Sequence, residues 1–302
     1  MPTAWRGGEA GCELGGFLGV SGRRTAGALV LPLARACHPE PTVAVTAVFT
    51  AFAAAAGRGV GTVGVAAAVL AGQLSVGWCN DYVDRDRDRR SGRIDKPIPA
   101  GAVAVRTVWI AAFVALAAAV PLSLLSGWRA ALAHLAGVTA AWGYNLGLKA
   151  TITSPLPYAV GFAGLPAFVV LGLPGHPMPP VWLLVAGASL GVGAHFANVL
   201  PDLDDDRVAG VVGLPHRIGA HASLGAAIGF LLAASGLLVA GPGASGTAIV
   251  ALIGGLALGA VVLALLGGRL ASRRPGSRAP FRVVLLVAIA DAAVLIVRAH
   301  GL

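Results

Sequence analysis

Long apolar runs separated by short polar segments dominate the sequence. A helix that crosses the hydrocarbon core of a bilayer needs about 20 mostly apolar residues. Nine runs come near that length, and the first of them is the shortest: 41–57, 60–79, 105–126, 129–148, 155–173, 180–200, 218–241, 246–268 and 281–299. The pattern predicts an all-α, multi-pass membrane protein with nine transmembrane helices.

The composition agrees with this pattern. Of the 302 residues, 57% are hydrophobic and 12% are charged, whereas a soluble domain carries about 25% charged residues. Alanine and glycine fill much of the apolar runs, and such small residues let the backbones of membrane helices approach closely. We expect a loosely ordered N-terminal tail over residues 1–40 and one transmembrane domain over residues 41–302.

The net charge of +9 follows the expected topology. With nine spans and a cytoplasmic N-terminus, four loops face the cytoplasm: 80–104, 149–154, 201–217 and 269–280. All but three of the 22 lysines and arginines lie in the tail or in and beside these loops; the exceptions are Arg58, Arg129 and Arg298. Cytoplasmic loops of membrane proteins are enriched in basic residues, so this distribution supports a cell-membrane location and indicates no nucleic-acid partner.

Nine of the 13 acidic residues fall in two of these loops. They are Asp81, Asp84, Asp86, Asp88 and Asp95, then Asp202, Asp204, Asp205 and Asp206. In the first cluster, Asn80, Asp84 and Asp88 are four residues apart, and in the second, His195, Asn198, Asp202 and Asp206 have spacings of three, four and four. On helices, each set shares one face.

Carboxylates this dense repel one another unless a cation neutralises them. Mg²⁺ prefers oxygen ligands and is commonly held by one or two carboxylates together with substrate phosphates. Two such stripes at the same membrane face therefore predict divalent metal and a polyanionic substrate such as a diphosphate.

The motifs themselves resemble those of a known family. Asn80-Asp81-x-x-Asp84-x-x-x-Asp88 is similar to the first aspartate-rich motif of the UbiA superfamily of intramembrane prenyltransferases. Asp202-x-x-x-Asp206-Arg207-x-x-Gly210 is similar to the second motif. The segments 96–101 and 144–149 also match, and the resemblance covers roughly residues 40–300.

Three positions depart from the family pattern. Asp95-Lys96-Pro97 stands where many members have an arginine before the prolines. The first helix is entered through His38-Pro39-Glu40-Pro41, where many members have an Arg-x-x-Pro-like entry. His216 occupies a position that is more usually apolar. These departures leave the role of the His38–Glu40 segment open.

The resemblance implies a helical bundle around a central cavity that opens to the cytoplasmic face. It also implies Mg²⁺-dependent transfer of a prenyl group from an isoprenyl diphosphate to an aromatic or other lipophilic acceptor within the membrane lipid. The implied metal ligands are Asn80, Asp81, Asp84, Asp88, Asn198, Asp202 and Asp206. The implied diphosphate-binding residues are Asn80, Arg93, Lys96, Lys149, Asn198 and Arg207. The implied catalytic residues are Asp84, Tyr144, Lys149 and Asp202.

Some of these residues have simpler explanations. Lys149 could extend from a helix end to the membrane interface, and Tyr144 could be an interfacial aromatic residue. His195 could contact substrate or satisfy a neighbouring polar group. Asp291 lies about ten residues into the last run, and we expect it to be a structural group although carboxylates inside membranes are often functional.

Two other functions compete with prenyl transfer. A terpene cyclase of the same superfamily would ionise the same diphosphate and trap the cation with the substrate's own double bonds. A cation transporter would place its ionisable residues near the bilayer midplane. The aspartates of this chain follow the ends of the apolar runs, which argues against transport.

Overall fold

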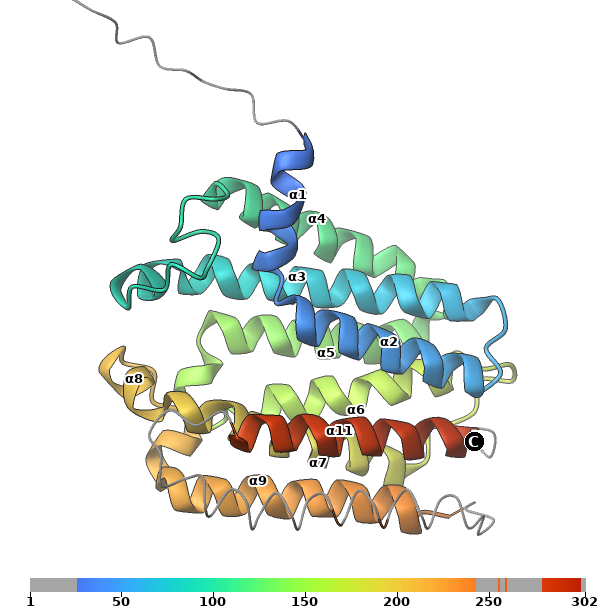
Figure 1. The fold of residues 1–302 in the computed structure, drawn as a ribbon. Helices are drawn as coiled ribbons and strands as arrows, with labels where there is room; N and C mark the ends of the chain where they lie inside the picture. The colour runs from blue at the N-terminus through green and yellow to red at the C-terminus, as the bar shows by residue number, and fades with distance from the viewer. Residues whose placement is uncertain (1–25, 243–254, 256–258, 260–278, 300–302) are drawn as a thin grey trace, which may run out of the picture.

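The computed structural model describes residues 26–242, 255, 259 and 279–299, and every regular element in these ranges is helical (Figure 1). The long helices are α2 (Pro39–Ala55), α3 (Gly61–Arg90), α4 (Val105–Leu124), α5 (Trp128–Leu146), α6 (Leu156–Leu171), α7 (Val181–Val199), α9 (Leu214–Ala240) and α11 (Ala279–Arg298). The short elements are α1 (Ala26–Ala36), α8 (Leu203–Val208) and two 3₁₀ turns, Leu148–Ala150 and Leu200–Asp202.

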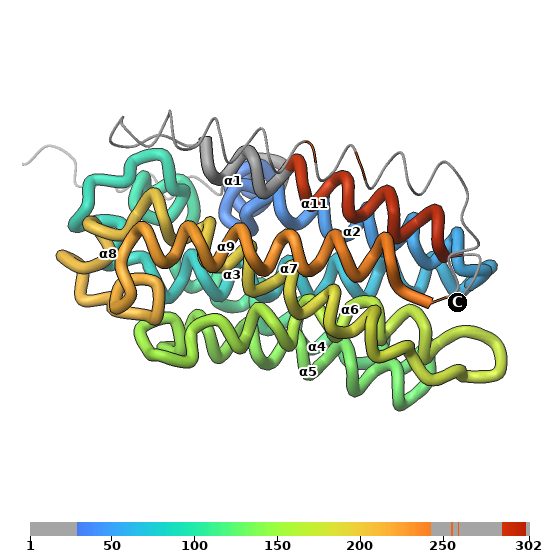
Figure 2. Tube along the Cα trace, turned by 90° about the horizontal axis from the view of Figure 1, so that it is seen from below, coloured from blue at the N-terminus to red at the C-terminus, as the bar shows by residue number. Residues whose placement is uncertain are grey.

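The long helices lie side by side, with neighbours in sequence packed together (Figures 1 and 2). Helix α3 packs against α2, α4 and α5, and α7 packs against α6 and α9. Helix α11 contacts α2, α7 and α9, which brings the last described helix back to the first long one. The C-terminal end of α3, the 91–104 loop and α8 all lie at one end of the bundle, at the left in Figure 1, which we call the acidic end.

The described residues confirm the predicted helical architecture, and several of the helices are suited to a membrane. Eight of the nine predicted spans coincide with the long helices, and the remaining one, 246–268, lies outside the described residues apart from positions 255 and 259. Four described segments are long and apolar enough to cross a bilayer: α3, α4, α9 and residues 181–208. The number of nine transmembrane helices stays a prediction.

Two boundaries differ from the expectation. Residues 26–36 form α1 and Pro39 begins α2, although both fall in the segment expected to be a loose tail. Proline suits the first turn of a helix because its missing N–H needs no partner there. Helix α1 is held on α3 by the indole of Trp78, which donates to the Leu33 carbonyl (2.9 Å). Residues 1–25 lie outside the described ranges.

Glycines bring the helices into close contact. A Cβ atom at Gly191 of α7 would lie 2.4 Å from the Tyr158 carbonyl of α6, and one at Gly77 of α3 would lie 2.2 Å from the Cys37 carbonyl. Both distances are far below a van der Waals contact, so only glycine fits there. The first contact sets Tyr158 beside the end of α7, and the second presses the α1–α2 junction against α3.

Buried polar groups away from the acidic end serve packing. Asp291 of α11 is 1% exposed and accepts a hydrogen bond from Ser235 of α9 (2.7 Å), in keeping with the structural role expected for it. At the opposite end, Arg58 donates to the Ser126 hydroxyl (2.7 Å), and Arg298 donates to the carbonyls of Gly241 and Pro242 beyond the end of α9. Two of the three basic residues outside the predicted cytoplasmic loops therefore bind loops and helix ends.

Candidate active site

The first acidic motif is helical throughout. Helix α3 continues to Arg90 instead of ending near residue 79, so the motif forms its last three turns. Asp81, Asp84 and Asp88 are 1%, 6% and 4% exposed, which is unusual for carboxylates. Their spacing places Asp84 and Asp88 on one face, as the sequence predicts, and that face is covered by other parts of the chain.

Asp84 is the most heavily bonded aspartate of the motif. One carboxylate oxygen accepts from the Lys149 ammonium, and the other accepts from Arg87 (2.8 Å) and from the Asn80 amide (3.2 Å). The Asn80 amide also donates to Asn145 of α5 (3.1 Å), so α5 is tied to α3 beside the motif. Lys149 follows directly after the end of α5, and its side chain reaches into the site from there.

Asp81 is paired with one residue from the loop after α3 and one from the α1–α2 junction. The Lys96 ammonium lies 2.5 Å from Asp81 Oδ1, and His38 Nε2 lies 3.5 Å from the same oxygen. His38 Nε2 is also within hydrogen-bond distance of Asn80 (3.0 Å) and Lys96 (3.1 Å). His38 has a left-handed backbone conformation (φ 57°) at the junction of α1 and α2, and this conformation turns its ring toward α3.

The second motif does not lie on one continuous helix. Helix α7 ends at Val199, a 3₁₀ turn covers Leu200–Asp202, and α8 then begins. Pro201 lacks the N–H that a continuing α-helix would need, which explains the break. His195, Asn198, Asp202 and Asp206 therefore do not lie on one uninterrupted α-helix, and a face shared by all four stays a prediction. Asn198 and Asp202 are exposed, whereas Asp206 is half-buried.

Asp206 faces the first motif across a basic side chain. Its Oδ1 atom accepts from Arg87 (3.4 Å), whose other nitrogen binds Asp84, and its Oδ2 atom lies 3.4 Å from His216 Nε2. The His216 ring is fixed because its Nδ1 atom accepts from the Gly213 backbone N–H (3.1 Å), which leaves the proton on Nε2 toward Asp206. Gly213 itself packs on the Lys149 carbonyl, where a Cβ atom would lie at 2.5 Å.

An aromatic cluster lies next to the motifs. The rings of Tyr144 and Tyr158 are 5.2 Å apart, and they lie 5.7 Å and 5.0 Å from the ring of His195. His195 is fully buried, and its Nε2 atom is 3.1 Å from the Ser154 hydroxyl, which also accepts from the Leu214 N–H. Tyr158 also interacts with the Asn198 amide, so this cluster borders the second motif.

Two residues that were predicted to bind the diphosphate contact other protein groups. Arg93 pairs with Asp95 through two hydrogen bonds of 3.0 and 3.1 Å, and both side chains are exposed; the bond from Arg93 lowers the pKa of Asp95. Arg207 donates to the His216 carbonyl and pairs with Asp204 (3.5 Å). Lys96 and Lys149 instead point into the acidic motifs.

Arg87, His38 and His216 are site residues that the sequence interpretation missed. Arg87 could have been found, because it follows Asp84 by three residues and so shares its helical face. His38 and His216 carry no such local signal. Their positions depend on which segments the fold brings together.

The donor set suits Mg²⁺. Asp81 Oδ2 and Asp88 Oδ2 are buried and have no hydrogen-bond partner among the described residues, so two carboxylate oxygens are left free to bind a cation. Within those residues, no three acidic, histidine or cysteine side chains converge on one point. Mg²⁺ that keeps several waters and takes one or two carboxylates together with phosphate oxygens needs no such convergence.

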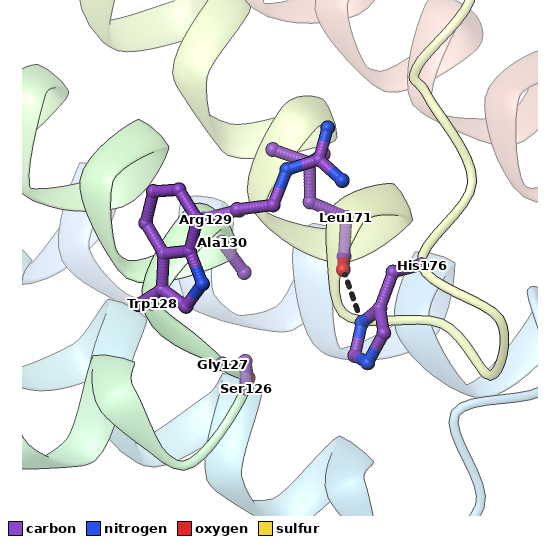
Figure 3. A pocket seen from close by; sticks show the side chains of 7 residues that line it. All are labelled: Ser126, Gly127, Trp128, Arg129, Ala130, Leu171 and His176. Carbon is purple, nitrogen blue, oxygen red and sulfur yellow. Dashed lines mark hydrogen bonds between the residues drawn. The ribbon is translucent and has the colours of Figure 1, made fainter.

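A separate pocket lies at the opposite end of the bundle (Figure 3). It has a volume of about 150 Å³ and is lined by Ser126, Gly127, Trp128, Arg129, Ala130, Leu171 and His176. These residues lie at the start of α5 and the end of α6, away from both motifs. The pocket therefore has no part in the site described above.

Both motifs lie in a segment that matches a known protein family. The family model of the UbiA prenyltransferase family matches residues 43–288, which include both motifs. The chain belongs to the UbiA prenyltransferase family. The resemblance of the two motifs is thereby confirmed, and the match extends over most of the chain.

Two curated relatives of this UbiA family chain are 32% identical to it. Digeranylgeranylglyceryl phosphate synthase of Natronomonas pharaonis matches over 176 residues, 56% of this chain and 62% of that protein. The bacteriochlorophyll synthase 33 kDa chain of Cereibacter sphaeroides matches over 169 residues, 50% of this chain and 53% of that protein. The matched part thus spans less than two thirds of either relative.

Solved structures support the fold. A UbiA homolog from Archaeoglobus fulgidus bound to GPP and Mg²⁺ has a TM-score of 0.67 at 18% identity, covering 89% of this chain and 98% of that one. The apo UbiA homolog from Aeropyrum pernix has a TM-score of 0.66 at 23% identity, covering 84% and 96%. Both structural matches cover most of this chain and nearly all of the solved structure, so they establish the helical architecture.

Proposed function

We propose that the protein is a Mg²⁺-dependent prenyltransferase of the cell membrane. It moves a prenyl group from an isoprenyl diphosphate to an aromatic or other lipophilic acceptor, at a site that faces the cytoplasm. One observation carries this proposal. Asp84 and Asp206, one from each acidic motif, bind the same Arg87 side chain at one end of a helical bundle. The ligands named in the Archaeoglobus fulgidus structure support it further.

Departure of diphosphate is the difficult step, because negative charge grows on the leaving group. Mg²⁺, when bound, supplies a Lewis acid that neutralises this charge. The residues that would hold it are Asp81, Asp84, Asp88, Asp202 and Asp206, with neutral oxygens from Asn80 and Asn198. Asp202 and Asn198 are exposed and Asp81 and Asp88 have free oxygens, so ligands are available from both motifs.

Basic side chains complete the charge balance around the diphosphate. Lys149 and Lys96 are largely buried, at 12% and 15% side-chain exposure, and each now neutralises an aspartate. With Mg²⁺ held by the carboxylates, these two ammonium groups would be free to bind phosphate oxygens. Arg93, in the loop after α3, and Arg207, on α8, are exposed, and from the solvent side they would attract the diphosphate.

The remaining allylic cation needs protection from water and a source of electron density. Tyr144 and Tyr158 lie beside His195, next to the second motif, and aromatic rings attract cations. Apolar helices exclude water from the reacting carbon, as such an intermediate requires. Tyr144 is thus assigned to stabilise the positive charge on the prenyl carbon that separates from the diphosphate. The rest of the prenyl chain lies among the helices.

Purified protein tests the proposal directly. It is incubated with Mg²⁺ and a set of prenyl diphosphates, with and without phenolic, quinonoid and glyceryl phosphate acceptors, and the products are identified by mass spectrometry. We expect prenylated acceptor and free diphosphate. Release of terpene hydrocarbon or alcohol without acceptor would instead identify a cyclase, and no consumption of any prenyl diphosphate would exclude both.

A further inference from the structure

Arg87 occupies the space between the two acidic motifs. Its guanidinium donates through Nη2 to Asp84 (2.8 Å) and through Nη1 to Asp206 (3.4 Å), so a single cation joins two residues that are both implied metal ligands. The Arg87 side chain is 28% exposed, so it is partly accessible to solvent.

We propose that Arg87 is an exchangeable counter-ion that makes Mg²⁺ and diphosphate bind together. Without substrate it neutralises Asp84 and Asp206; with substrate it moves to the diphosphate and releases both carboxylates to the metal. This inference rests on the proposed function and deepens it, because it names the residue that couples the two ligands.

Neither carboxylate depends on Arg87 alone. Asp84 also accepts from Lys149 and Asn80, and Asp206 lies beside His216. Removal of the guanidinium therefore leaves both carboxylates with another polar neighbour. What it does change is the net charge of the space between the motifs, which becomes more negative by one unit. Arg87 therefore contributes a positive charge between the motifs, and neither carboxylate needs it as its only partner.

The charge explains the exchange. A divalent ion that approaches Asp84 or Asp206 alone is repelled by Arg87 and competes with it for the same oxygens. A diphosphate removes both obstacles, because the planar guanidinium binds phosphate oxygens through two parallel hydrogen bonds. Metal binding thus becomes favourable when diphosphate arrives, and diphosphate binding becomes favourable when metal takes the carboxylates.

Arg87→Gln separates the two effects, and Arg89→Gln is the matched control. Arg89 lies on the same helix, is 53% exposed, and pairs with Asp86 at 3.9 Å, away from both metal-binding faces. Full-length protein in detergent is titrated with Mn²⁺ alone, followed by electron paramagnetic resonance. It is then titrated with a thio-substituted geranyl diphosphate in the presence of Mg²⁺. Thermal unfolding of each variant is measured in parallel.

The proposal predicts shifts of opposite sign in Arg87→Gln. Mn²⁺ alone should bind about fivefold more tightly, because a nearby positive charge is removed. The diphosphate analogue should bind about tenfold more weakly, because a charge-assisted fork is lost. Arg89→Gln should change neither affinity.

Other outcomes overturn the inference. Unchanged affinities in Arg87→Gln, or a loss of both affinities together, would show that Arg87 is a bystander or a structural residue. Arg87→Lys keeps the positive charge and loses the two parallel hydrogen bonds of the guanidinium. It should therefore leave Mn²⁺ binding unchanged and weaken binding of the diphosphate analogue. If the wild-type protein binds no analogue, the proposed function fails as well; if it binds the analogue and the opposite shifts are missing, only the role of Arg87 is refuted.

Discussion

Asp84 and Asp206 bind the two terminal nitrogens of one guanidinium, that of Arg87, although they belong to the two separate acidic motifs. The two contacts connect the end of α3 with α8. They also make the two carboxylates a unit, so that a change in one alters the charge balance of the other.

Substitution of either carboxylate should abolish turnover. We expect Asp84→Asn and Asp206→Asn each to lower the rate of prenyl transfer by about 100-fold or more, because each removes charge that stabilises the leaving group. Asparagine preserves the shape and one acceptor oxygen, so the circular dichroism of the detergent-purified variants should match the parent. Turnover retained in both variants would remove the metal role from these residues.

Chelation should stop the reaction reversibly. Excess EDTA removes the cation that neutralises the departing diphosphate, and added Mg²⁺ should restore the initial rate. The measurement is diphosphate release over time at fixed pH. Asp88→Asn should raise the Mg²⁺ concentration needed for half-maximal rate, since a buried and unpartnered oxygen of Asp88 is available to the metal. A rate that survives chelation would contradict the mechanism.

Lys149 should contribute more to binding of the diphosphate than to the stability of the fold. We expect Lys149→Gln to raise the KM for the prenyl diphosphate about tenfold, because a charge-assisted hydrogen bond contributes ~1.5–3 kcal/mol. Asp84 would keep Arg87 and Asn80 as partners, so thermal stability should change little. Lys149→Arg serves as the control that restores the charge. An unchanged KM in Lys149→Gln would place this lysine outside the substrate site.

Gly213 should tolerate no side chain. A Cβ atom there would lie 2.5 Å from the Lys149 carbonyl and 2.9 Å from the Ser154 hydroxyl oxygen. Gly213→Ala should therefore push the start of α9 away from the loop that carries Lys149, lowering turnover and destabilising the protein by about 1–3 kcal/mol. Gly229→Ala in α9 is the matched control, because no atom lies within 4 Å of its Cβ position. Equal thermal stability of the two variants would refute this packing argument.

Local periodicity accounts for the parts of the site that the sequence predicts. Asn80, Asp84 and Asp88 recur every four residues, so any helix would align them, and α3 does so. The same rule predicts the second stripe, but a 3₁₀ turn at Leu200–Asp202 interrupts the α-helix between Asn198 and Asp206, so local spacing alone does not fix their relative orientation. Residues 26–36, which lie in the expected tail, form α1, and the contact that holds this helix comes from α3.

The sequence by itself determined the membrane class, the helices and the two acidic motifs, since hydropathy and residue spacing act over one or a few turns. Only the tertiary structure decided that Arg87 joins Asp84 to Asp206, that His38 reaches Asp81, and that Gly213 packs on Lys149. The physical reason is range: these partners are far apart along the chain, and helix packing alone brings their charges within a few ångströms.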